Sequence, residues 1–423
     1  MRDRPGAAGG GAREGPRAPG CAVREGREGP PLTGCAANVR KIYAIRFLFW
    51  FHTVSAVLVP FFRDWGGLSL GGVFLLNAWF QAWSFALEVP TGTVADRLGR
   101  KTSVCLGTAA GALAVPLYVA TPEVGAFLVA EVLMALAMAL NSGADEALLY
   151  ESLPERDPLV ARRVFARAES WKLAGIVAGA LVGSALATRT SVRGVFAFQA
   201  LPMALSAVLA LSLREPPARA APGAARPGFL QLAREGARQL AARRTLRILA
   251  FDMISVGALV WLVIWLYQPL LEAAGVPLAA FGSVHVAAAL GQIAILASAD
   301  RAQSWLGSQR ALLFATALVP GAAFVALGVV RAPVAVAGLV VVAWSLGMAR
   351  TPLFTAALNR HIDSEQRATV LSLVSGLRRL GIVVANATAS LFVASALHGT
   401  ALAIGVAVLA LALVSRVREE HLA

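Results

Sequence analysis

Ten residues between two long apolar runs hold a carboxylate and three cations. Residues 92–101 read GTVADRLGRK. The carboxylate of Asp96 directly precedes Arg97, and two further cations follow within five positions. Opposite charges this close together can form ion pairs that break and re-form. The chemistry that these residue types support is reversible charge pairing at the end of a membrane segment.

Further ionisable residues lie inside apolar segments, where they are costly unless they face a cavity or a partner. The candidates for binding a proton or substrate are Glu88, Glu131, Asp252, His285, Arg378 and Arg379. A proton-coupling group must be a carboxylate or histidine whose pKa can move near neutrality, and we rank Glu88 and Glu131 first. His285 is alternatively a hydrogen-bonded structural residue. Adjacent helix positions point about 100° apart, so at most one of the two arginines faces a cavity squarely and attracts an anionic substrate.

The elements that position these residues are long apolar segments. The chain is 57% hydrophobic, only 15% charged, and has a mean hydropathy of +0.67. About 20 apolar residues cross ~30 Å of hydrocarbon as a helix, because backbone polar groups in lipid must be satisfied within the segment. We therefore predict an all-α integral membrane protein with twelve spans. The predicted spans are 43–62, 70–92, 102–120, 124–149, 165–187, 194–213, 247–270, 279–299, 310–329, 333–356, 369–396 and 399–416.

One long polar interruption divides the twelve spans into two six-helix halves. The predicted parts are a disordered basic tail over 1–39, an N-terminal half over 40–213, a linker over 214–246, a C-terminal half over 247–416 and a tail over 417–423. The tail over 1–39 is either a membrane-surface arm or a functionless extension. Residues 229–246 have Arg opposite an apolar face, which predicts an interfacial amphipathic helix.

The formal net charge of +14 gathers on one side of the predicted topology. With both termini in the cytoplasm, the inner loops hold seventeen Lys and Arg residues, against four in the outer loops. The outer four are Arg63, Arg189, Arg193 and Arg331. We therefore predict a multi-pass protein of the cell membrane that contacts anionic lipid heads, with no need for nucleic acid as a partner.

The two halves repeat one another faintly. Asp96 and Asp300 follow the second span of each half, 204 positions apart. Gly143 and Gly347 are separated by the same 204 positions. Together with the loop over 92–101, these features resemble the twelve-helix transporters of the major facilitator superfamily over nearly the whole chain. The resemblance implies two pseudo-symmetric halves with a substrate site between them near mid-membrane.

In that family the loop between helices 2 and 3 is a gating motif. Its consensus positions here are Gly92, Asp96, Arg97, Gly99, Arg100 and Lys101. The resemblance implies that Asp96 pairs with a neighbouring Arg and faces the positive start of helix 11, at 367–369, as a clasp between the halves. Gly92 is expected to permit close helix approach. Alternatively, the basic residues of the loop only enforce topology.

In the resembled fold, helices 1, 4, 7 and 10 line the central cavity. Glu146 and Arg350 share the 204 offset, so we expect an ion pair of Asp145 or Glu146 with Arg350 as an inner gate. A purely structural salt bridge is the alternative. A cavity of this kind implies a small-molecule substrate.

The fifth span resembles a motif of drug–proton antiporters. Gly175, Gly179 and Gly183 match its glycines, and small residues at this spacing also pack membrane helices closely. Ala180 stands where that motif has proline, Ser184 replaces a glycine, and helix 4 has Ala139 where drug exporters carry an arginine. These departures put a standard drug–proton mechanism in doubt.

The sequence predicts a monomeric secondary transporter that exports small amphiphilic compounds, with a proton as the candidate coupling ion. A lipid flippase on the same fold and a non-transporting membrane sensor are the alternatives. An enzyme is not expected, since no nucleophile–base pair or HExxH motif occurs. No Walker-type loop is present either, which argues against an ATP-driven pump. We expect no cofactor and no metal, because the three cysteines have no metal-ligand spacing.

Overall fold

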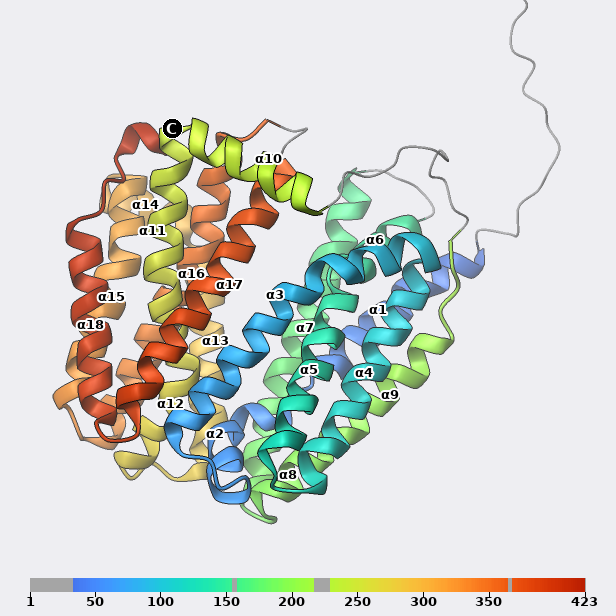
Figure 1. Ribbon diagram of the computed structural model, residues 1–423, viewed down its shortest axis with the longest axis horizontal. Coiled ribbons are helices and arrows are strands. Elements are labelled where there is room, and N and C mark those ends of the chain that lie inside the picture. The colour runs from blue at the N-terminus through green and yellow to red at the C-terminus, as the bar shows by residue number, and fades with distance from the viewer. Residues whose placement is uncertain (1–32, 154–157, 217–228, 364–366, 423) are drawn as a thin grey trace, which may run out of the picture.

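The structure is a computed structural model that describes residues 33–153, 158–216, 229–363 and 367–422. Side chains left out within these ranges are those of 33–36, Val89, Asp96, Pro158, 229–233 and Ala368. The described ranges are helical and contain no β-strand. Two helical halves stand side by side (Figure 1). The predicted tail over 1–39 falls mostly outside the described residues, and helix α1 begins within it, at Thr33.

Each of the six N-terminal segments lies on a helix or a broken helix. In chain order the helices are α1 (Thr33–Phe49), α2 (Leu58–Pro60), α3 (Leu70–Leu98), α4 (Arg100–Ala120), α5 (Val124–Asn141), α6 (Ala144–Glu151), α7 (Pro158–Ala187), α8 (Val192–Phe198) and α9 (Ala200–Leu211). Spans 1, 4 and 6 are each interrupted, while α3, α4 and α7 cross without a break.

The six C-terminal segments are helical as well. Their helices are α11 (Arg244–Trp261), α12 (Val263–Ala273), α13 (Phe281–Ala297), α15 (Gln309–Val329), α16 (Pro333–Arg360), α17 (Arg367–Val393) and α18 (Leu397–Leu413). Helix α10 (Phe229–Ala242) occupies the linker, and α14 (Ala299–Leu306) joins α13 to α15. Within the described ranges, ten helices are long and apolar enough to cross a membrane, or eleven with the bent first span, and α18 is a shorter apolar helix.

Two breaks have local causes in the backbone. The first span bends by 67° beyond α1, where a 3-10 turn (η1, Thr53–Ala56) and a π-helical turn (η2, Phe61–Trp65) flank α2. The fourth span is split at Gly143, whose φ of +74° belongs to the left-handed region that glycine tolerates best. This break lets α6 set its own direction, and α6 carries Asp145.

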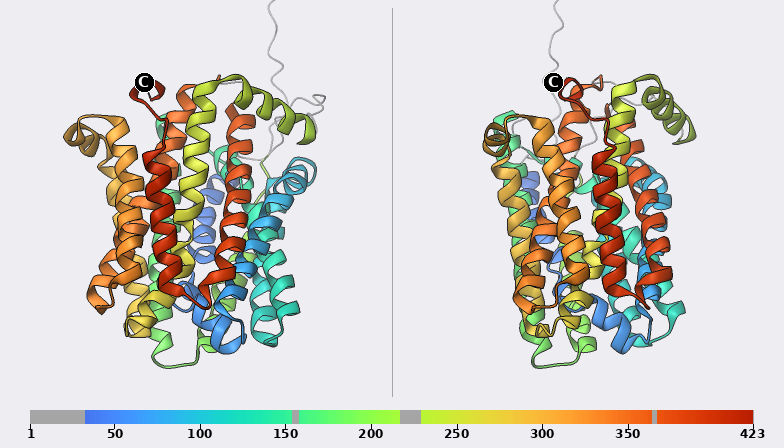
Figure 2. Two further views of the ribbon diagram at one scale, coloured as in Figure 1. Left: turned by 60° about the vertical axis from the view of Figure 1, so that its left-hand side comes forward. Right: turned by 90° about the vertical axis from the view of Figure 1, so that its left-hand side faces the viewer.

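The apolar cores show how the halves meet. We call the end that holds α10 and the C-terminus the linker end, and the end that holds α2, α8 and α12 the opposite end (Figures 1 and 2). One large core cluster joins Phe62 and Phe196 of the N-terminal half to Tyr267 and Phe281 of the C-terminal half. The halves have separate clusters near the linker end. The halves are therefore sealed together toward the opposite end.

The same capping contact occurs in each half. Glu215, after the sixth span, accepts hydrogen bonds from the backbone N–H groups of Arg100 and Lys101 at the start of α4, both at 2.7 Å. Glu419 lies 204 positions later and caps α15 through the N–H groups of Gln309 and Arg310, at 3.0 and 2.9 Å. A carboxylate at a helix N-terminus satisfies free N–H groups and the helix dipole. The faint sequence repeat thus corresponds to a repeated structural contact.

Candidate functional site

The first ionic cluster lies inside the N-terminal half. Arg46 of α1 is 7% exposed, and its Nε donates to Asp145 of α6 at 2.8 Å. The same guanidinium lies 3.8 Å from Glu169 of α7, which also pairs with Lys172 at 2.8 Å. The Lys172 ammonium sits 5.0 Å from the ring centroid of Trp50. This cluster ties together the first, fourth and fifth spans of one half.

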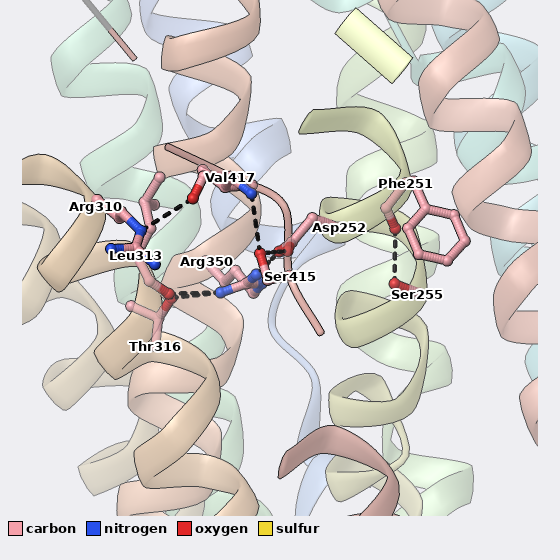
Figure 3. Close-up of polar contacts among 9 residues, drawn as sticks. All are labelled: Phe251, Asp252, Ser255, Arg310, Leu313, Thr316, Arg350, Ser415 and Val417. Carbon is pink, nitrogen blue, oxygen red and sulfur yellow. Dashed lines mark hydrogen bonds and ion pairs between the residues drawn. The ribbon is translucent and has the colours of Figure 1, made fainter. Parts of the chain in front are cut away.

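The C-terminal half has a more deeply buried ionic cluster (Figure 3). Arg350 of α16 pairs with Asp252 of α11, and their side chains are 3% and 6% exposed. Arg350 also donates to the backbone carbonyl of Leu313 at 2.6 Å and to the hydroxyl of Thr316 at 3.0 Å. Ser415, just beyond α18, donates its hydroxyl to Asp252. The pair thus joins four helices of its half near the linker end.

The two pairs are pseudo-symmetric with their charges exchanged. In the N-terminal half the first span supplies Arg46 and the fourth supplies Asp145. In the C-terminal half the first span supplies Asp252 and the fourth supplies Arg350. A buried charge requires a partner, so each pair constrains how the first and fourth spans of its half pack together. Each pair therefore ties the first and fourth spans of its own half together.

The structure does not bring Asp145 or Glu146 to Arg350, so the expected inner-gate pair is absent from this conformation. Asp145 is bound by Arg46, Glu146 is exposed, and Arg350 is bound by Asp252. The 204 offset identifies equivalent positions, but equivalence under a pseudo-twofold does not require contact.

Polar contacts between the halves gather toward the opposite end. The amide of Gln268 in α12 accepts from the backbone N–H of Val59 at 2.7 Å and donates to the carbonyl of Ser55 at 2.7 Å. The Tyr267 hydroxyl donates to the same carbonyl. Nearby, Arg63 and Glu272 form an ion pair at 2.8 Å. These contacts hold the broken first span against α12.

A further ion pair crosses between α3 and α17. Arg379 Nε lies 3.7 Å from Glu88 Oε2, and both side chains are about one third exposed, at 28% and 32%. The neighbouring Arg378 turns to its own half, where its guanidinium lies 5.7 Å from the ring of Trp261. One of the adjacent arginines therefore reaches the other half. Trp261 Nε1 is buried and has no hydrogen-bond partner within the described residues.

Glu131 and His285 occupy separate apolar surroundings. Glu131 of α5 is 7% exposed, packs in the core of the N-terminal half, and is hydrogen-bonded to Tyr118. His285 of α13 lies 4.9 Å from the ring of Trp344, and its Nδ1 has no hydrogen-bond partner among the described residues. No group of three or more metal-ligating side chains occurs in the described part of the chain.

The charged loop over 92–101 has only part of its expected contacts. The side chain of Asp96 lies outside the described residues, and so does that of Ala368 in the expected clasp. A Cβ at Gly92 would meet no atom within 4 Å, so the expected close helix approach is not seen there. The halves are apart at this end, which leaves Gly92 exposed. Arg97 is exposed too, and Arg100 Nε lies 3.7 Å from Glu151.

The glycines of the fifth span face the first span. A Cβ would lie 2.4 Å from the carbonyl oxygen of Phe47 at Gly175, 2.4 Å from the His52 nitrogen at Gly179, and 2.0 Å from the Thr53 oxygen at Gly183. Only glycine fits at these contacts. Ser184, one residue further, accepts from the Gly282 N–H of the other half at 2.8 Å.

Sequence reasoning did not single out several residues of these clusters. Arg46, Gln268 and Ser415 were not candidates, and Asp252 was considered as a proton or substrate site but not as the partner of Arg350. A usable signal was present: Asp252 follows Arg46 by 206 positions, and Arg350 follows Asp145 by 205. Ionic residues recurring at nearly the repeat offset, with opposite signs, indicate an internal pair in each half.

Comparison with known proteins places the chain among transporters. The profile described as Major Facilitator Superfamily matches residues 42–386. No curated protein matches the chain significantly. The structure is similar to the nucleoside transporter NupG (TM-score 0.73, 13% identity, 90% of this chain and 97% of that one) and to a D-xylose–proton symporter (0.68, 15%, 92% and 99%). It is also similar to a POT family transporter in complex with 5-aminolevulinic acid (0.68, 13%, 89% and 95%).

Proposed function

The chain belongs to the major facilitator superfamily, and from this premise we propose that it exports small amphiphilic compounds by alternating access, with protons as the coupling ion. The family makes the chain a multi-pass membrane protein and a secondary transporter. In alternating access, two halves rock about a site between them. The observation that carries the proposal is the uneven contact of the halves, with one shared core and two separate ones.

The side on which this conformation is open fits an exporter that loads from the cytoplasm, and an importer would release its cargo from the same conformation. The halves are sealed toward the opposite end, and the basic loops favour the linker end as the cytoplasmic one. In that orientation, this conformation offers the space between the halves to the cytoplasm. A transporter that loads from the cytoplasm and releases after rocking is an exporter.

Two aromatic–cation contacts, one in each half, suit an amphiphile. Trp50 and Lys172 pair an aromatic face with a cation in one half, and Trp261 and Arg378 do so in the other. Aromatic faces bind apolar rings, and Arg378 offers a charged partner to a polar or anionic group, whereas Lys172 is already paired with Glu169. We infer a cargo with an apolar ring and one polar or anionic substituent.

Glu88 is the proton-coupling residue in this proposal. Its carboxylate attracts Arg379 of the other half, at 3.7 Å. A proton on Glu88 would remove that negative charge and weaken the attraction between α3 and α17 of the two halves. Glu131 is the second choice, because its contacts lie within one half.

The test is transport in inverted vesicles that carry an internal pH dye. A panel of lipophilic cations, neutral amphiphiles and aromatic anions is added to vesicles with an acidic interior. We expect the aromatic anions to accumulate and to dissipate the proton gradient. With Glu88→Gln, cargo exchange should continue while proton flux stops. Glu123→Gln is the matched control, because Glu123 is an exposed carboxylate outside the inter-half contacts.

Two outcomes would contradict the proposal. Cargo entry only into right-side-out vesicles would reverse the direction. If no compound of the panel is transported by correctly inserted protein, lipid transport becomes the favoured function. Transport of labelled phospholipids would then test it.

The cell membrane and cytoplasmic termini are part of the same proposal. In intact cells, a membrane-impermeant thiol reagent should label Arg331→Cys and should not label Arg301→Cys. Both residues lie near helix ends, on opposite sides of the proposed topology. The reverse labelling would overturn the orientation.

A further inference from the structure

A cavity of about 470 Å³ lies between α11 and α18 near the linker end. Its volume is in the range of small-ligand sites. The two helices lie side by side on the outer surface of the C-terminal half (Figure 2), away from the contacts with the N-terminal half. The cavity is therefore distinct from the space in which alternating access would move cargo.

Three arginines give this cavity a positive charge. Arg244 and Arg247 come from the first turn of α11, and Arg416 follows the end of α18. All three are exposed, and within the described ranges none of them forms an ion pair. The carboxylate that lines the cavity, Asp252, is already bound by Arg350. The site therefore carries uncompensated positive charge at a helix end, where the membrane surface would lie.

The remaining wall of the cavity is apolar. Phe251 is 65% exposed and Val414 is 67% exposed, and Ile248 and Leu411 lie beside them. Side chains this apolar on the outer surface of a membrane helix contact acyl chains. A ligand that fits must therefore join an anionic group to a hydrocarbon chain.

We propose that this cavity binds an anionic phospholipid, with the headgroup phosphate among the three arginines and an acyl chain along Phe251 and Val414. Basic pockets between membrane helices favour such headgroups. The lipid would come from the leaflet at the linker end, which is the cytoplasmic leaflet in the proposed orientation. The inference requires membrane insertion only and does not depend on cargo, direction or coupling.

The lipid would stabilise the contact between the start of α11 and the end of α18. Ser415 lines the cavity and donates to Asp252, so it connects the cavity wall to the buried pair with Arg350. A phosphate bound there holds the ends of α11 and α18 together. Lipid binding should therefore raise the thermal stability of the protein.

The experiment measures lipid binding to the purified full-length protein by native mass spectrometry. The probes are phosphatidylglycerol and phosphatidylcholine with identical acyl chains. We expect selective retention of phosphatidylglycerol and a higher melting temperature in its presence. The variant Arg244→Gln/Arg247→Gln/Arg416→Gln should bind it about 100-fold more weakly, on the order of fivefold per arginine.

The control variant Arg162→Gln/Arg163→Gln/Arg301→Gln removes three exposed arginines elsewhere and should bind like the wild type. If the triple variant does not fold, Arg247→Gln and Arg416→Gln are tested singly, each with a fivefold loss expected. Equal retention of both lipids, or unchanged binding by the cavity variants, would overturn the proposal. Displacement of the lipid by equimolar inorganic phosphate would assign the cavity to a free anion instead.

Discussion

At the scale of single residues, Asp252 and Arg350 form a deeply buried ion pair in the described C-terminal half. Its side chains are almost fully buried, and its contacts reach α11, α15, α16 and Ser415. A buried pair of this kind adds little net stability compared with apolar residues, but losing one partner leaves an uncompensated charge. The pair is therefore sensitive to single substitutions and tolerant of matched double ones.

We predict that Asp252→Ala destabilises the protein by about 3–5 kcal/mol, because Arg350 is then buried without a counter-charge. The double variant Asp252→Leu/Arg350→Met should recover most of that loss. Thermal or detergent-induced unfolding of the purified protein measures both. A double variant as unstable as the single one would show that the loss comes from packing and not from charge.

The 204-residue offset between the halves could not predict the partner of Arg350. The repeat offset suggested Glu146, because it states which positions are equivalent in the two halves. Whether equivalent positions touch depends on how far apart the halves stand at that end, which no spacing encodes. The exchange of charge signs between Arg46 and Asp252, and between Asp145 and Arg350, would have predicted the observed pairs better. Pairs within one half do not depend on how far apart the halves stand.

At the scale of elements, the two capping carboxylates define how the third helix of each half begins. Glu215 and Glu419 each accept two backbone N–H groups at a helix start. Both contacts also fix the chain that follows the sixth span of the same half. A cap made by a remote residue is thus a tie between elements.

We predict that Glu215→Ala and Glu419→Ala each cost about 1 kcal/mol of stability, the usual value of a helix cap. Glu420→Ala is the matched control, because Glu420 is 65% exposed and pairs weakly with neighbours. Melting temperatures of the three variants measure the stability that each one loses. Equal effects at Glu419 and Glu420 would contradict the capping role.

The contact of α7 with α1 gives a second prediction at this scale. Gly183→Ala places a Cβ 2.0 Å from the Thr53 oxygen, so the helices must separate, and we expect a loss of about 1–3 kcal/mol. Gly338→Ala in α16 meets no atom within 4 Å and should be neutral or slightly stabilising. Thermal unfolding compares the two. Equal behaviour would exclude close packing as the reason for glycine at 183.

The positions of the helices were predictable and their breaks were not. Long apolar runs predicted where the helices lie, because crossing hydrocarbon takes about 20 apolar residues. Within the described ranges, ten or eleven helices reach that length, and α18 is shorter. The breaks at Gly143 and after Phe49 depend on backbone conformation and on tertiary contacts, such as those of His52 and Thr53 with the glycines of α7. A hydropathy profile does not detect such contacts.

At the scale of the whole molecule, a small set of polar contacts holds the halves together at the opposite end, in addition to the packing of α3 on α17 and of α7 on α13. Gln268 and Tyr267 hold the broken first span, and Arg63 pairs with Glu272. Apolar packing of the shared core surrounds them. Opening this end requires these contacts to separate together.

We predict that a thiol cross-linker joining Arg63→Cys to Glu272→Cys, in a chain with its three native cysteines replaced, stops transport reversibly. The cross-link would hold the conformation described here, and cleavage of the linker should restore activity. The control is the variant Arg63→Cys/Asp64→Cys, in which the cross-link stays within one half. Continued transport by the cross-linked inter-half variant would contradict a rocking motion at this end.

The neutrality of the two buried pairs has an electrical consequence. Each pair of opposite charges belongs to one half, so rocking carries no net charge from Arg46 with Asp145, or from Asp252 with Arg350, through the membrane field. A single unbalanced charge crossing the field would gain or lose about 2.3 kcal/mol per 100 mV. These two pairs should therefore contribute little to the voltage dependence of turnover, which leaves the cargo, the coupled proton and the remaining charges within the spans to set it.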